Sequence, residues 1–588
     1  MGAVAQVVKT TPQGAIGQEQ LGLVIPMRDG VRLAADLFLP TPNGRWPTVL
    51  IRTPYNRKTP ANAGYRYFAR RGYAVVIQDV RGRFASEGIF GSIAQEGPDG
   101  DDTISWISSQ AWSDGSVVMA GSSYTGMTDW WAAIQNNPHL LSISTLTAGD
   151  DEYIDRYYSD GGALQAGHRL LWLAENLTPP SHVRPLFESY IGHLPLRTAD
   201  LLATGQILPM WRVALSHPSR DAFWKSASIR ERIGRVSVPV LSFGGWFDEY
   251  APSDLDAFSR LAKRGHEVET WIGPWSHDPG WSFPTRSFGP EANIPFRVKQ
   301  ADWFERWTRK AAGSFGENNG PLLHIFVMGP NVWREEREWP LARTRFTPLY
   351  MRSGGHANTG SGDGALQWQP VRKGPSDSFV YDPRNPVPTK GGSICCEPTV
   401  LTPGPLDQTS IETRSDVLVY TSTPLTSEVE VTGPVRTVLY VATSANDTDF
   451  TAKLVDVQPG GKPLLVTDGI QRLRYRLSLD QAVFVKRNTP YQISVDCGVT
   501  SYVFAPGHRI RVEISSSNFP RFDRSMNSPR ANADEMKLTK ARQTIYHEKG
   551  YPSAIILPIV PRTGLRGAGG SHAHNLHIRS GLKGPHAT

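Results

Sequence analysis

Cysteine is scarce in this sequence, with Cys395, Cys396 and Cys497 the three cysteines among 588 residues. Their number and spacing exclude a disulfide framework and a C-x-x-C metal site. Adjacent cysteines rarely bridge each other, so we expect buried free thiols, with a Cys396–Cys497 bridge as the alternative. Cysteine content therefore leaves the redox compartment undecided.

Long apolar runs are also missing. No stretch of about 18 apolar residues occurs, which argues against a transmembrane helix and a membrane partner. Residues 1–18 lack an uninterrupted apolar segment of signal-peptide length. We therefore expect a soluble, cytoplasmic protein, and secretion stays open as the alternative.

Runs of one charge are absent as well. The net charge is +7, and lysine and arginine are scattered along the chain, so the sequence gives little support for a nucleic-acid partner. With 39% hydrophobic residues and 17 tryptophans, the composition is that of a folded globular protein. The length predicts roughly three or four domains.

The first part of the chain alternates apolar strands with helical segments. Asp29-Gly30 between alternating apolar residues predicts a hairpin. Continuous apolar runs then predict buried strands, which occur at 47–52, 73–79, 117–121, 140–146, 236–243 and 267–273. Strands alternating with helices are typical of an α/β fold with a doubly wound parallel sheet.

Changes in this pattern predict the domain limits. An α/β domain occupies residues 1–146 and 237–345, and helix-like spacings between them predict an inserted helical cap at 147–236. Short strands with Gly/Pro turns predict a β sandwich of the jelly-roll type at 346–562. Residues 563–588 are rich in Gly, His and Ser and are predicted to be a flexible tail.

A small-residue turn after the strand at 117–121 is the first candidate for chemistry. Between Gly121 and Gly126 the chain reads Ser-Ser-Tyr-Thr, so Thr125 stands where the G-x-S-x-G elbow has its second glycine. Small residues are needed there because a strand that turns abruptly into a helix leaves the serine strained and projecting. We predict Ser123 as the nucleophile, with Ser122 as the competing residue.

An acid and a base follow later in the chain. Asp248 and His277 each come just after a predicted parallel strand, which gives the order Ser, Asp, His of α/β-hydrolases. His277 would accept the proton of the Ser123 hydroxyl, and Asp248 would orient the imidazole. These groups and water complete the chemistry, so we expect no cofactor and no metal.

Several motifs occur in one order along nearly the whole chain. They are 27–30 (MRDG), 52–55 (RTPY), 78–82 (QDVRG), 121–126 (GSSYTG), 245–248 (GWFD), 273–277 (GPWSH), 447–454 (DTDFTAKL) and 506–511 (PGHRIR). This set resembles the cocaine esterase-like (X-Pro dipeptidyl-peptidase, S15) hydrolases. The resemblance implies an α/β-hydrolase domain, a helical cap and a jelly roll, with the oxyanion held by the Tyr124 amide and the Tyr55 hydroxyl. It also implies a dimer or tetramer as a possible homo-oligomer.

The substrate is the least determined feature. Aromatic residues suggest a pocket for a bulky or aromatic acyl group, and those we single out are Phe84, Trp130, Tyr153, Trp172, Trp246 and Phe247. Asp151 and Glu249 could instead form a carboxylate cage for an ammonium group. We predict a serine carboxylesterase for a small-molecule ester. The alternatives are an amidase, an α-amino-acid ester hydrolase or acyltransferase, and an X-Pro dipeptidyl-peptidase.

Overall fold

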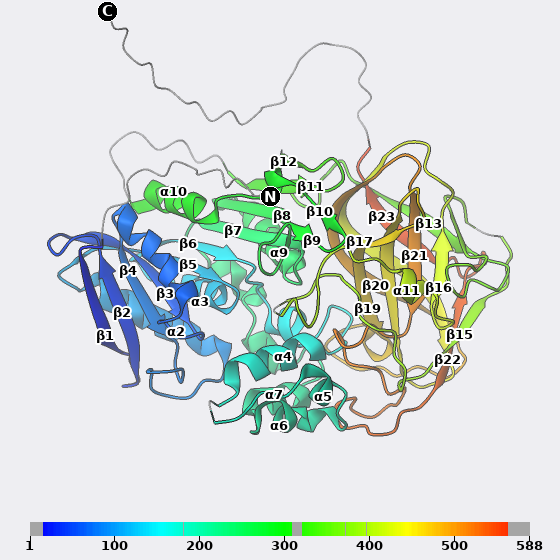
Figure 1. Ribbon diagram of the computed structural model, residues 1–588, viewed down its shortest axis with the longest axis horizontal. Helices are drawn as coiled ribbons and strands as arrows, with labels where there is room; N and C mark the ends of the chain where they lie inside the picture. Colours follow the sequence, from blue (N-terminus) through cyan, green and yellow to red (C-terminus); the bar gives the residue numbers. More distant parts are fainter. Residues whose placement is uncertain (1–15, 180, 309–319, 371, 396, 562–588) are drawn as a thin grey trace, which may run out of the picture.

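The computed structural model describes residues 16–179, 181–308, 320–370, 372–395 and 397–561. A mixed sheet with its helices lies on the left of Figure 1, and a body built almost entirely of strands lies on the right. A group of short helices lies below both, and it comes from the middle of the first half of the chain. The predicted tail at 563–588 lies outside the described residues.

The sheet of the first body has ten strands in the order β1-β2-β4-β3-β5-β6-β7-β8-β11-β12. The strands are β1 Gln18–Pro26, β2 Arg32–Leu39, β3 Trp46–Thr53, β4 Ala74–Asp79, β5 Ser113–Ser122, β6 Leu140–Leu146, β7 Val240–Phe247, β8 Val268–Ser276, β11 Leu322–Val327 and β12 Val332–Glu336. The run from β4 to β11 is parallel, while β1, β2 and β12 pair antiparallel at the two edges. The antiparallel β1–β2 pair is the hairpin predicted from Asp29-Gly30.

Apolar side chains pack on both faces of this sheet. Leu50, Val76 and Met119 belong to one core, and their chain neighbours Val49, Val75 and Val118 belong to another. Successive strand side chains point to opposite faces, so an unbroken apolar run fills both cores. Helices α2 Glu96–Ser108, α3 Tyr124–Ala133 and α9 Ala251–Ala262 contribute to the first core, and α10 Phe296–Thr308 contributes to the second.

Between β6 and β7 the chain leaves the sheet and forms the lower group of helices in Figure 1. Its elements are a π-helix η4 Glu152–Tyr157, α4 Ala166–Leu177, α5 Phe187–Ile191, α6 Ala199–Thr204, α7 Pro209–Ser216 and α8 Ala222–Ser226. The parallel strands end at the same edge of the sheet. A cavity lies at this edge, and the cap residues that line it belong to α4.

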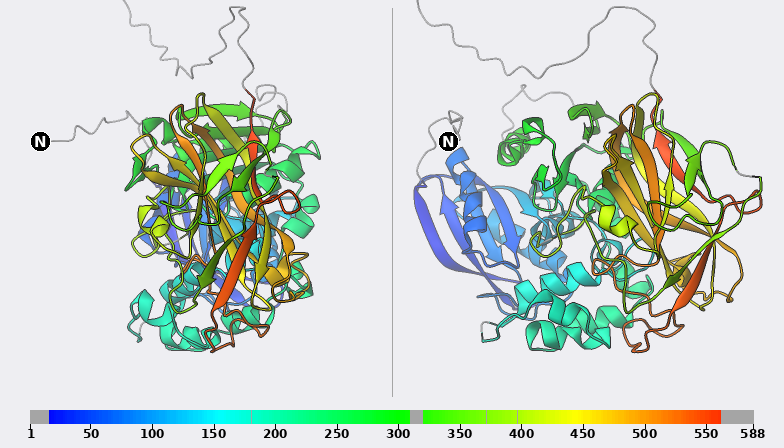
Figure 2. Two further views of the ribbon diagram at one scale, coloured as in Figure 1. Left: turned by 90° about the vertical axis from the view of Figure 1, so that its right-hand side faces the viewer. Right: turned by 45° about the vertical axis from the view of Figure 1, so that its right-hand side comes forward.

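The second body is rich in strands and pairs them in one extended network. Its elements are β13 Arg345–Arg352, β14 Ala365–Gln367, β15 Asp377–Tyr381, α11 Thr409–Glu412, β16 Leu418–Thr421, β17 Val429–Thr443, β18 Asp449–Val457, β19 Pro463–Arg472, β20 Tyr491–Phe504, β21 Arg509–Ser515, β22 Ala541–Tyr546 and β23 Ala554–Ile559. The right-hand view in Figure 2 shows this body beside the α/β sheet, with the cap helices along the bottom of both.

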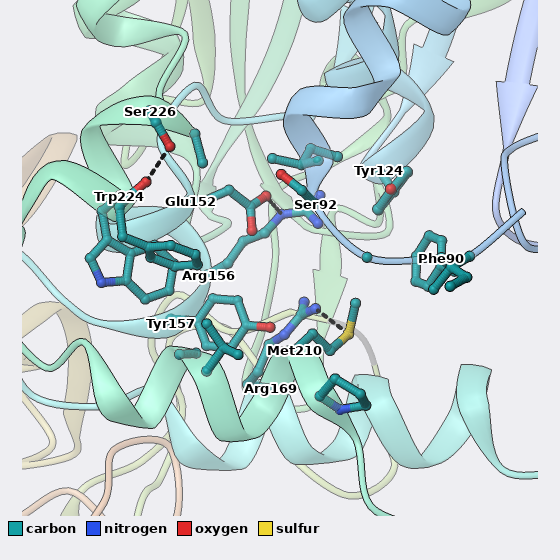
Figure 3. A pocket seen from close by; sticks show the side chains of 18 residues that line it. Phe90, Ser92, Tyr124, Glu152, Arg156, Tyr157, Arg169, Met210, Trp224 and Ser226 are labelled. Atoms are coloured by element: carbon teal, nitrogen blue, oxygen red, sulfur yellow. Dashed lines mark hydrogen bonds and ion pairs between the residues drawn. The ribbon is translucent and has the colours of Figure 1, made fainter. Parts of the chain in front are cut away.

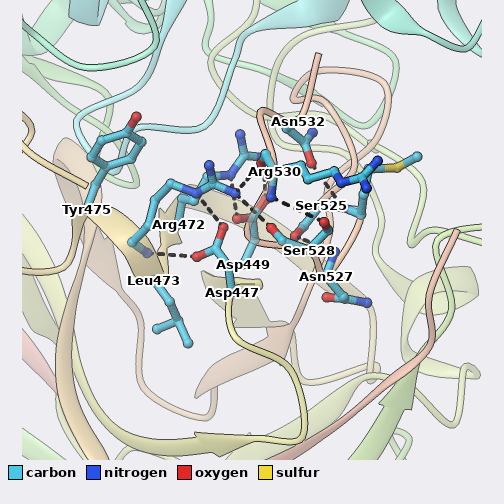
Figure 4. Close-up of polar contacts among 12 residues, drawn as sticks. Asp447, Asp449, Arg472, Leu473, Tyr475, Ser525, Asn527, Ser528, Arg530 and Asn532 are labelled. Carbon is cyan, nitrogen blue, oxygen red and sulfur yellow. Dashed lines mark hydrogen bonds and ion pairs between the residues drawn. The ribbon is translucent and has the colours of Figure 1, made fainter. Parts of the chain in front are cut away.

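A buried ion-pair network contains Asp449 of the 447–454 motif (Figure 4). Arg472 donates to both carboxylate oxygens of Asp449 at 2.9 and 2.8 Å and to Asp523 at 2.7 Å. Asp523 also accepts from the backbone N–H of Leu164, and Arg472 N donates to Gly161 O, so the network reaches the cap. Bidentate pairing fixes geometry better than a point charge does.

The cysteine expectation needs correction. Cys497 is a buried free thiol, so the alternative Cys396–Cys497 bridge does not form. Cys395, however, is disulfide-bonded, so the expectation of free thiols is wrong for this residue. The prediction relied on the rarity of bridges between adjacent cysteines, and the sequence gives no signal of the backbone geometry that decides whether a bridge forms.

Within the described residues, the longest stretches of helix fall short of the length and apolar character that crossing a bilayer requires.

Candidate active site

Ser123 occupies the sharp turn between β5 and α3. Its φ and ψ are 56° and −127°, a strained conformation for a residue with a side chain. The turn is fixed on both sides, because Ser123 N donates to Leu146 O at 2.9 Å and Met127 N donates to Ser123 O at 3.0 Å. This is the strand-to-helix elbow that the sequence predicts.

The glycines of the elbow are required by close packing. A Cβ on Gly121 would lie 2.3 Å from the carbonyl carbon of Thr125, and one on Gly126 would lie 2.9 Å from Ala148 Cβ. Both distances are shorter than real Cβ contacts. Glycine is therefore needed at 121 and 126, whereas 125 accepts threonine.

Asp248 and His277 follow β7 and β8, and they meet at the edge of the sheet. His277 Nδ1 lies 3.1 Å from Asp248 Oδ1, and both side chains are buried. Burial opposes the imidazolium, but the charge and hydrogen bond of Asp248, with Glu249 and Asp278, raise the pKa of His277 above its usual value. Burial raises the pKa of Asp248, and His277 opposes that rise. The Tyr250 ring packs edge-on against the imidazole.

Ser123 and His277 line one cavity of about 390 Å³. The other lining residues come from loops and helices far apart in the chain, and they are Tyr55, Ala61, Asn62, Tyr65, Ser122, Thr125, Trp172, Glu175, Asn176, Asp278 and Arg297. The cavity therefore brings the predicted nucleophile and base together beneath cap helix α4.

Tyr55 reaches this cavity from the loop after β3. Tyr55 N donates to Thr53 Oγ1 at 3.1 Å, and Arg83 Nε donates to Pro54 O at 3.1 Å, so both sides of the loop are held. The hydroxyl of Tyr55 accepts a hydrogen bond from Trp172 Nε1 at 3.3 Å. Tyr124 is the first residue of α3, where a backbone N–H has no partner inside the helix. Tyr55 therefore lines the same cavity as Ser123, and Tyr124 follows Ser123 directly in the chain.

Comparison with known proteins places this arrangement in a family. Residues 29–279 match the family model described as X-Pro dipeptidyl-peptidase (S15 family), and residues 315–556 match its C-terminal non-catalytic domain. Cocaine esterase of Rhodococcus sp. (strain MB1 Bresler) is 38% identical over 92% of this chain and 98% of that protein. The chain belongs to the cocaine esterase-like (X-Pro dipeptidyl-peptidase, S15) family of α/β-hydrolases.

Two solved structures resemble the chain over almost its whole length. An aminopeptidase from a marine sediment Thaumarchaeota archaeon has a TM-score of 0.80, and an α-amino acid ester hydrolase has a TM-score of 0.79. Each is 25% identical and covers 95% of this chain and 99% of the other. The predicted family, α/β-hydrolase fold class and serine ester hydrolase class are thereby confirmed.

One of the predicted substrate-binding aromatic residues, Trp172, lines the cavity of Ser123. Four others are buried elsewhere, because their side chains complete cores or bond to backbone carbonyls: Trp130, Tyr153, Trp246 and Phe247. Tyr153, for example, donates to Pro218 O, and Trp246 donates to Phe326 O. Phe84 is 55% exposed and lies outside the cavity lining. These positions correct the predicted aromatic pocket.

The predicted carboxylate cage is also corrected. Asp151 is fully buried and accepts hydrogen bonds from Arg220 at 2.6 Å and from Ser228 at 2.7 Å. Glu249 is buried against His168, with 2.7 Å between Nδ1 and Oε1. Neither carboxylate lines the cavity of Ser123.

Sequence reasoning missed several residues that line the cavity. Arg297 lies with its guanidinium 3.7 Å from the ring centroid of Tyr65. Glu175 projects from α4, and burial together with a hydrogen bond to Glu397 raises its pKa to about 7. Glu175 lies one helical turn after Trp172, so helical spacing from that aromatic residue was a signal that could have found it.

Proposed function

We propose that this enzyme hydrolyses esters of bulky or aromatic acids that carry no free ammonium group. Ser123 acts as the nucleophile, His277 as the general base and Asp248 as the residue that orients it. The attack forms a bond from Ser123 Oγ to the acyl carbon, and His277 passes the serine proton to the departing alcohol. Water then repeats the sequence on the acyl-enzyme and releases the acid.

The oxyanion of each tetrahedral intermediate is held by the Tyr124 amide and the Tyr55 hydroxyl. These donors act on charge that develops only during the reaction, so they favour the transition state over the bound ester. The small-molecule ester is the one partner that this mechanism needs. The name of the Rhodococcus relative, cocaine esterase, supports an ester as the substrate class.

The observation that carries the choice of acyl group is the position of Asp151 and Glu249. An ammonium group needs a free carboxylate in the cavity, and neither of these two lines it, because Asp151 pairs with Arg220 and Glu249 lies against His168. Glu175 does line the cavity, but a pKa of about 7 leaves about half of this carboxyl protonated at pH 7. Its Oε1 also lies 3.4 Å from Arg184 Nη1, so the ionised form already has a cation beside it. Tyr55, Tyr65 and Trp172 supply the aromatic wall.

A comparison of phenylacetyl and phenylglycyl methyl esters tests this proposal. We expect kcat/KM to be higher for the phenylacetyl ester. Ser123→Ala should abolish turnover of both, whereas Asp151→Asn should leave the preference unchanged. A preference for the phenylglycyl ester that disappears in Glu175→Gln would instead favour an α-amino-acid ester hydrolase, the activity for which one of the similar solved proteins is named.

Amides form the second comparison. The archaeal aminopeptidase of similar fold makes peptide hydrolysis the competing function. Matched phenylacetyl anilides and X-Pro dipeptide amides should react far more slowly than the ester. Equal or faster turnover of the X-Pro substrates would overturn the esterase proposal while leaving the roles of Ser123 and His277 intact.

A further inference from the structure

A second cavity, of about 260 Å³, lies between the cap and the loop at residues 89–93 of the α/β domain. Figure 3 shows its wall, with α4 and α7 of the cap on one side and Ser92 and Phe90 on the other. Ser123 and His277 are not among the residues that line it. It is therefore separate from the cavity of the proposed nucleophile.

The charges that line this cavity do not balance. They comprise one carboxylate, on Glu152, and two guanidinium groups, on Arg156 and Arg169. Arg156 Nε lies 3.4 Å from Glu152 Oε1, so these two neutralise each other. Arg169 is left as an excess positive charge although the residue is only 3% exposed.

The contacts of Arg169 are with neutral groups. Its guanidinium lies 4.5 Å from the ring centroids of Tyr157 and Trp172, and Nη2 contacts the sulfur of Met210 at 3.9 Å. The Tyr157 hydroxyl is a further hydrogen-bond partner. Among the described residues, no carboxylate lies within ion-pair distance of Arg169, and its Nε has no hydrogen-bond partner. A buried cation without an anion is unfavourable, and aromatic faces compensate only in part.

The rest of the wall is apolar and reaches the surface. Met210, Val213 and Trp224 line the cavity, and Val213 is 41% exposed at its rim. Phe223, also on the rim, is 39% exposed. A ligand that enters here would bury apolar surface first and meet one unpaired guanidinium inside. Pockets with mostly apolar walls and few polar groups are typical of small-molecule sites.

We propose that this cavity binds an amphipathic monocarboxylate, such as an aryl-alkyl carboxylate. The carboxylate pairs with Arg169, and the apolar body contacts Met210, Val213 and Trp224. A planar guanidinium can donate two parallel hydrogen bonds to a carboxylate, which a neutral amide cannot reproduce. One negative charge on the ligand also balances the charge of the wall.

Trp172 contacts both this site and the catalytic cavity. Its side chain lines the catalytic cavity, and its ring centroid lies 4.5 Å from the Arg169 guanidinium. The Tyr124 ring stacks on Trp172 with 6.2 Å between centroids and lines the second cavity. Because the two cavities are this close, the test must distinguish binding to one from binding to the other.

The probe is 4-phenylbutanoate, with 4-phenylbutanamide as its neutral isostere. Both are titrated by calorimetry against the full-length enzyme whose Ser123 has been phosphonylated, so that the catalytic cavity is occupied. We expect the acid to bind at least about tenfold more tightly than the amide, in line with a charge-assisted pair. Arg169→Gln should abolish the preference, and Arg235→Gln, an exposed cap arginine, should retain it.

A third variant covers the case in which Arg169→Gln fails to fold. Val213→Trp fills the rim from an exposed position and should abolish binding of both probes, with an unchanged circular dichroism spectrum. Equal affinity for acid and amide in the unmutated enzyme would overturn the proposal. Loss of binding on phosphonylation would do so as well, because it would assign the probe to the catalytic cavity.

Discussion

The indole N–H of Trp172 donates a hydrogen bond to the phenol oxygen of Tyr55 at 3.3 Å, across the boundary between the cap and the α/β domain. Tyr55 thus accepts from the cap while its own proton is free to point to the oxyanion. The hydrogen bond makes the phenol a better donor, since linked hydrogen bonds polarise one another. The cap therefore contributes to the proposed chemistry as well as to the cavity wall.

Tyr55→Phe should lower kcat by about 100- to 1,000-fold, because it removes one of two donors to the oxyanion. KM should change much less, since the lost interaction forms mainly in the transition state. Steady-state kinetics with a 4-nitrophenyl ester measures both constants.

Trp172→Phe is the matched variant, because it keeps an aromatic wall and removes only the indole donor. We expect a smaller fall in kcat than for Tyr55→Phe. If Tyr55→Phe retained full kcat, Tyr55 would be a wall residue and not an oxyanion donor.

The elbow glycines give a prediction about stability. Gly121→Ala places a Cβ within 2.3 Å of the Thr125 backbone, and this clash can be relieved only by moving the turn that holds Ser123. We expect a loss of about 3 kcal/mol or more, the upper range for overpacking, and a fall in activity. Thermal unfolding at a fixed scan rate gives the change in Tm.

Gly192→Ala is the control for the elbow. This glycine has right-handed φ and ψ, and no atom lies within 4 Å of an added Cβ. Its Tm should stay near that of the unmutated enzyme. A Gly121→Ala protein with unchanged Tm and activity would contradict the packing that we describe at the elbow.

The order of nucleophile, acid and base could be predicted because each residue follows a strand with an unmistakable apolar run. Parallel strands end at one edge, so Ser123, Asp248 and His277 had to lie near one another. Local sequence also placed the hairpin at Asp29-Gly30 and the helical insertion. These features depend on periodicity and on turn chemistry, both of which are local.

The lining of the cavity could not be predicted in the same way. Asp151 is neutralised by Arg220, which lies 69 residues further along the chain. Trp246 donates a hydrogen bond to the backbone oxygen of Phe326, which lies 80 residues further along the chain. The neighbouring sequence gives no sign of such a partner. The sequence alone therefore does not distinguish an acidic or aromatic residue that faces the substrate from one that faces the core.

The buried Arg472 network predicts a large effect on stability. Arg472→Met would leave Asp449 and Asp523 buried without their guanidinium, and breaking a buried pair in this way costs about 3–5 kcal/mol. The control is Lys225→Met, which removes the same charge from a pair with Asp480 whose side chains are 41% and 53% exposed. Exposed pairs contribute about 0–1 kcal/mol.

Thermal unfolding of both variants measures this difference. The Tm of Arg472→Met should fall well below that of Lys225→Met. Similar Tm values would mean that the Asp449 and Asp523 carboxylates are solvated or protonated once the arginine is removed.

The acid limb of the pH profile should depend on Glu249. His277 acts as a base only when neutral, so kcat/KM falls as the pH drops through the pKa of this imidazole. The negative charge of Glu249 favours the imidazolium and helps to raise that pKa above its usual value.

Glu249→Gln removes this charge, so the pKa of His277 should fall and the acid limb should move to lower pH. The measurement is kcat/KM from about pH 5 to pH 9, with Glu188→Gln, an exposed residue of α5, as the control that leaves the limb in place. An acid limb that stays at the same pH, or moves to higher pH, in Glu249→Gln would show that Glu249 does not act on His277 in this way.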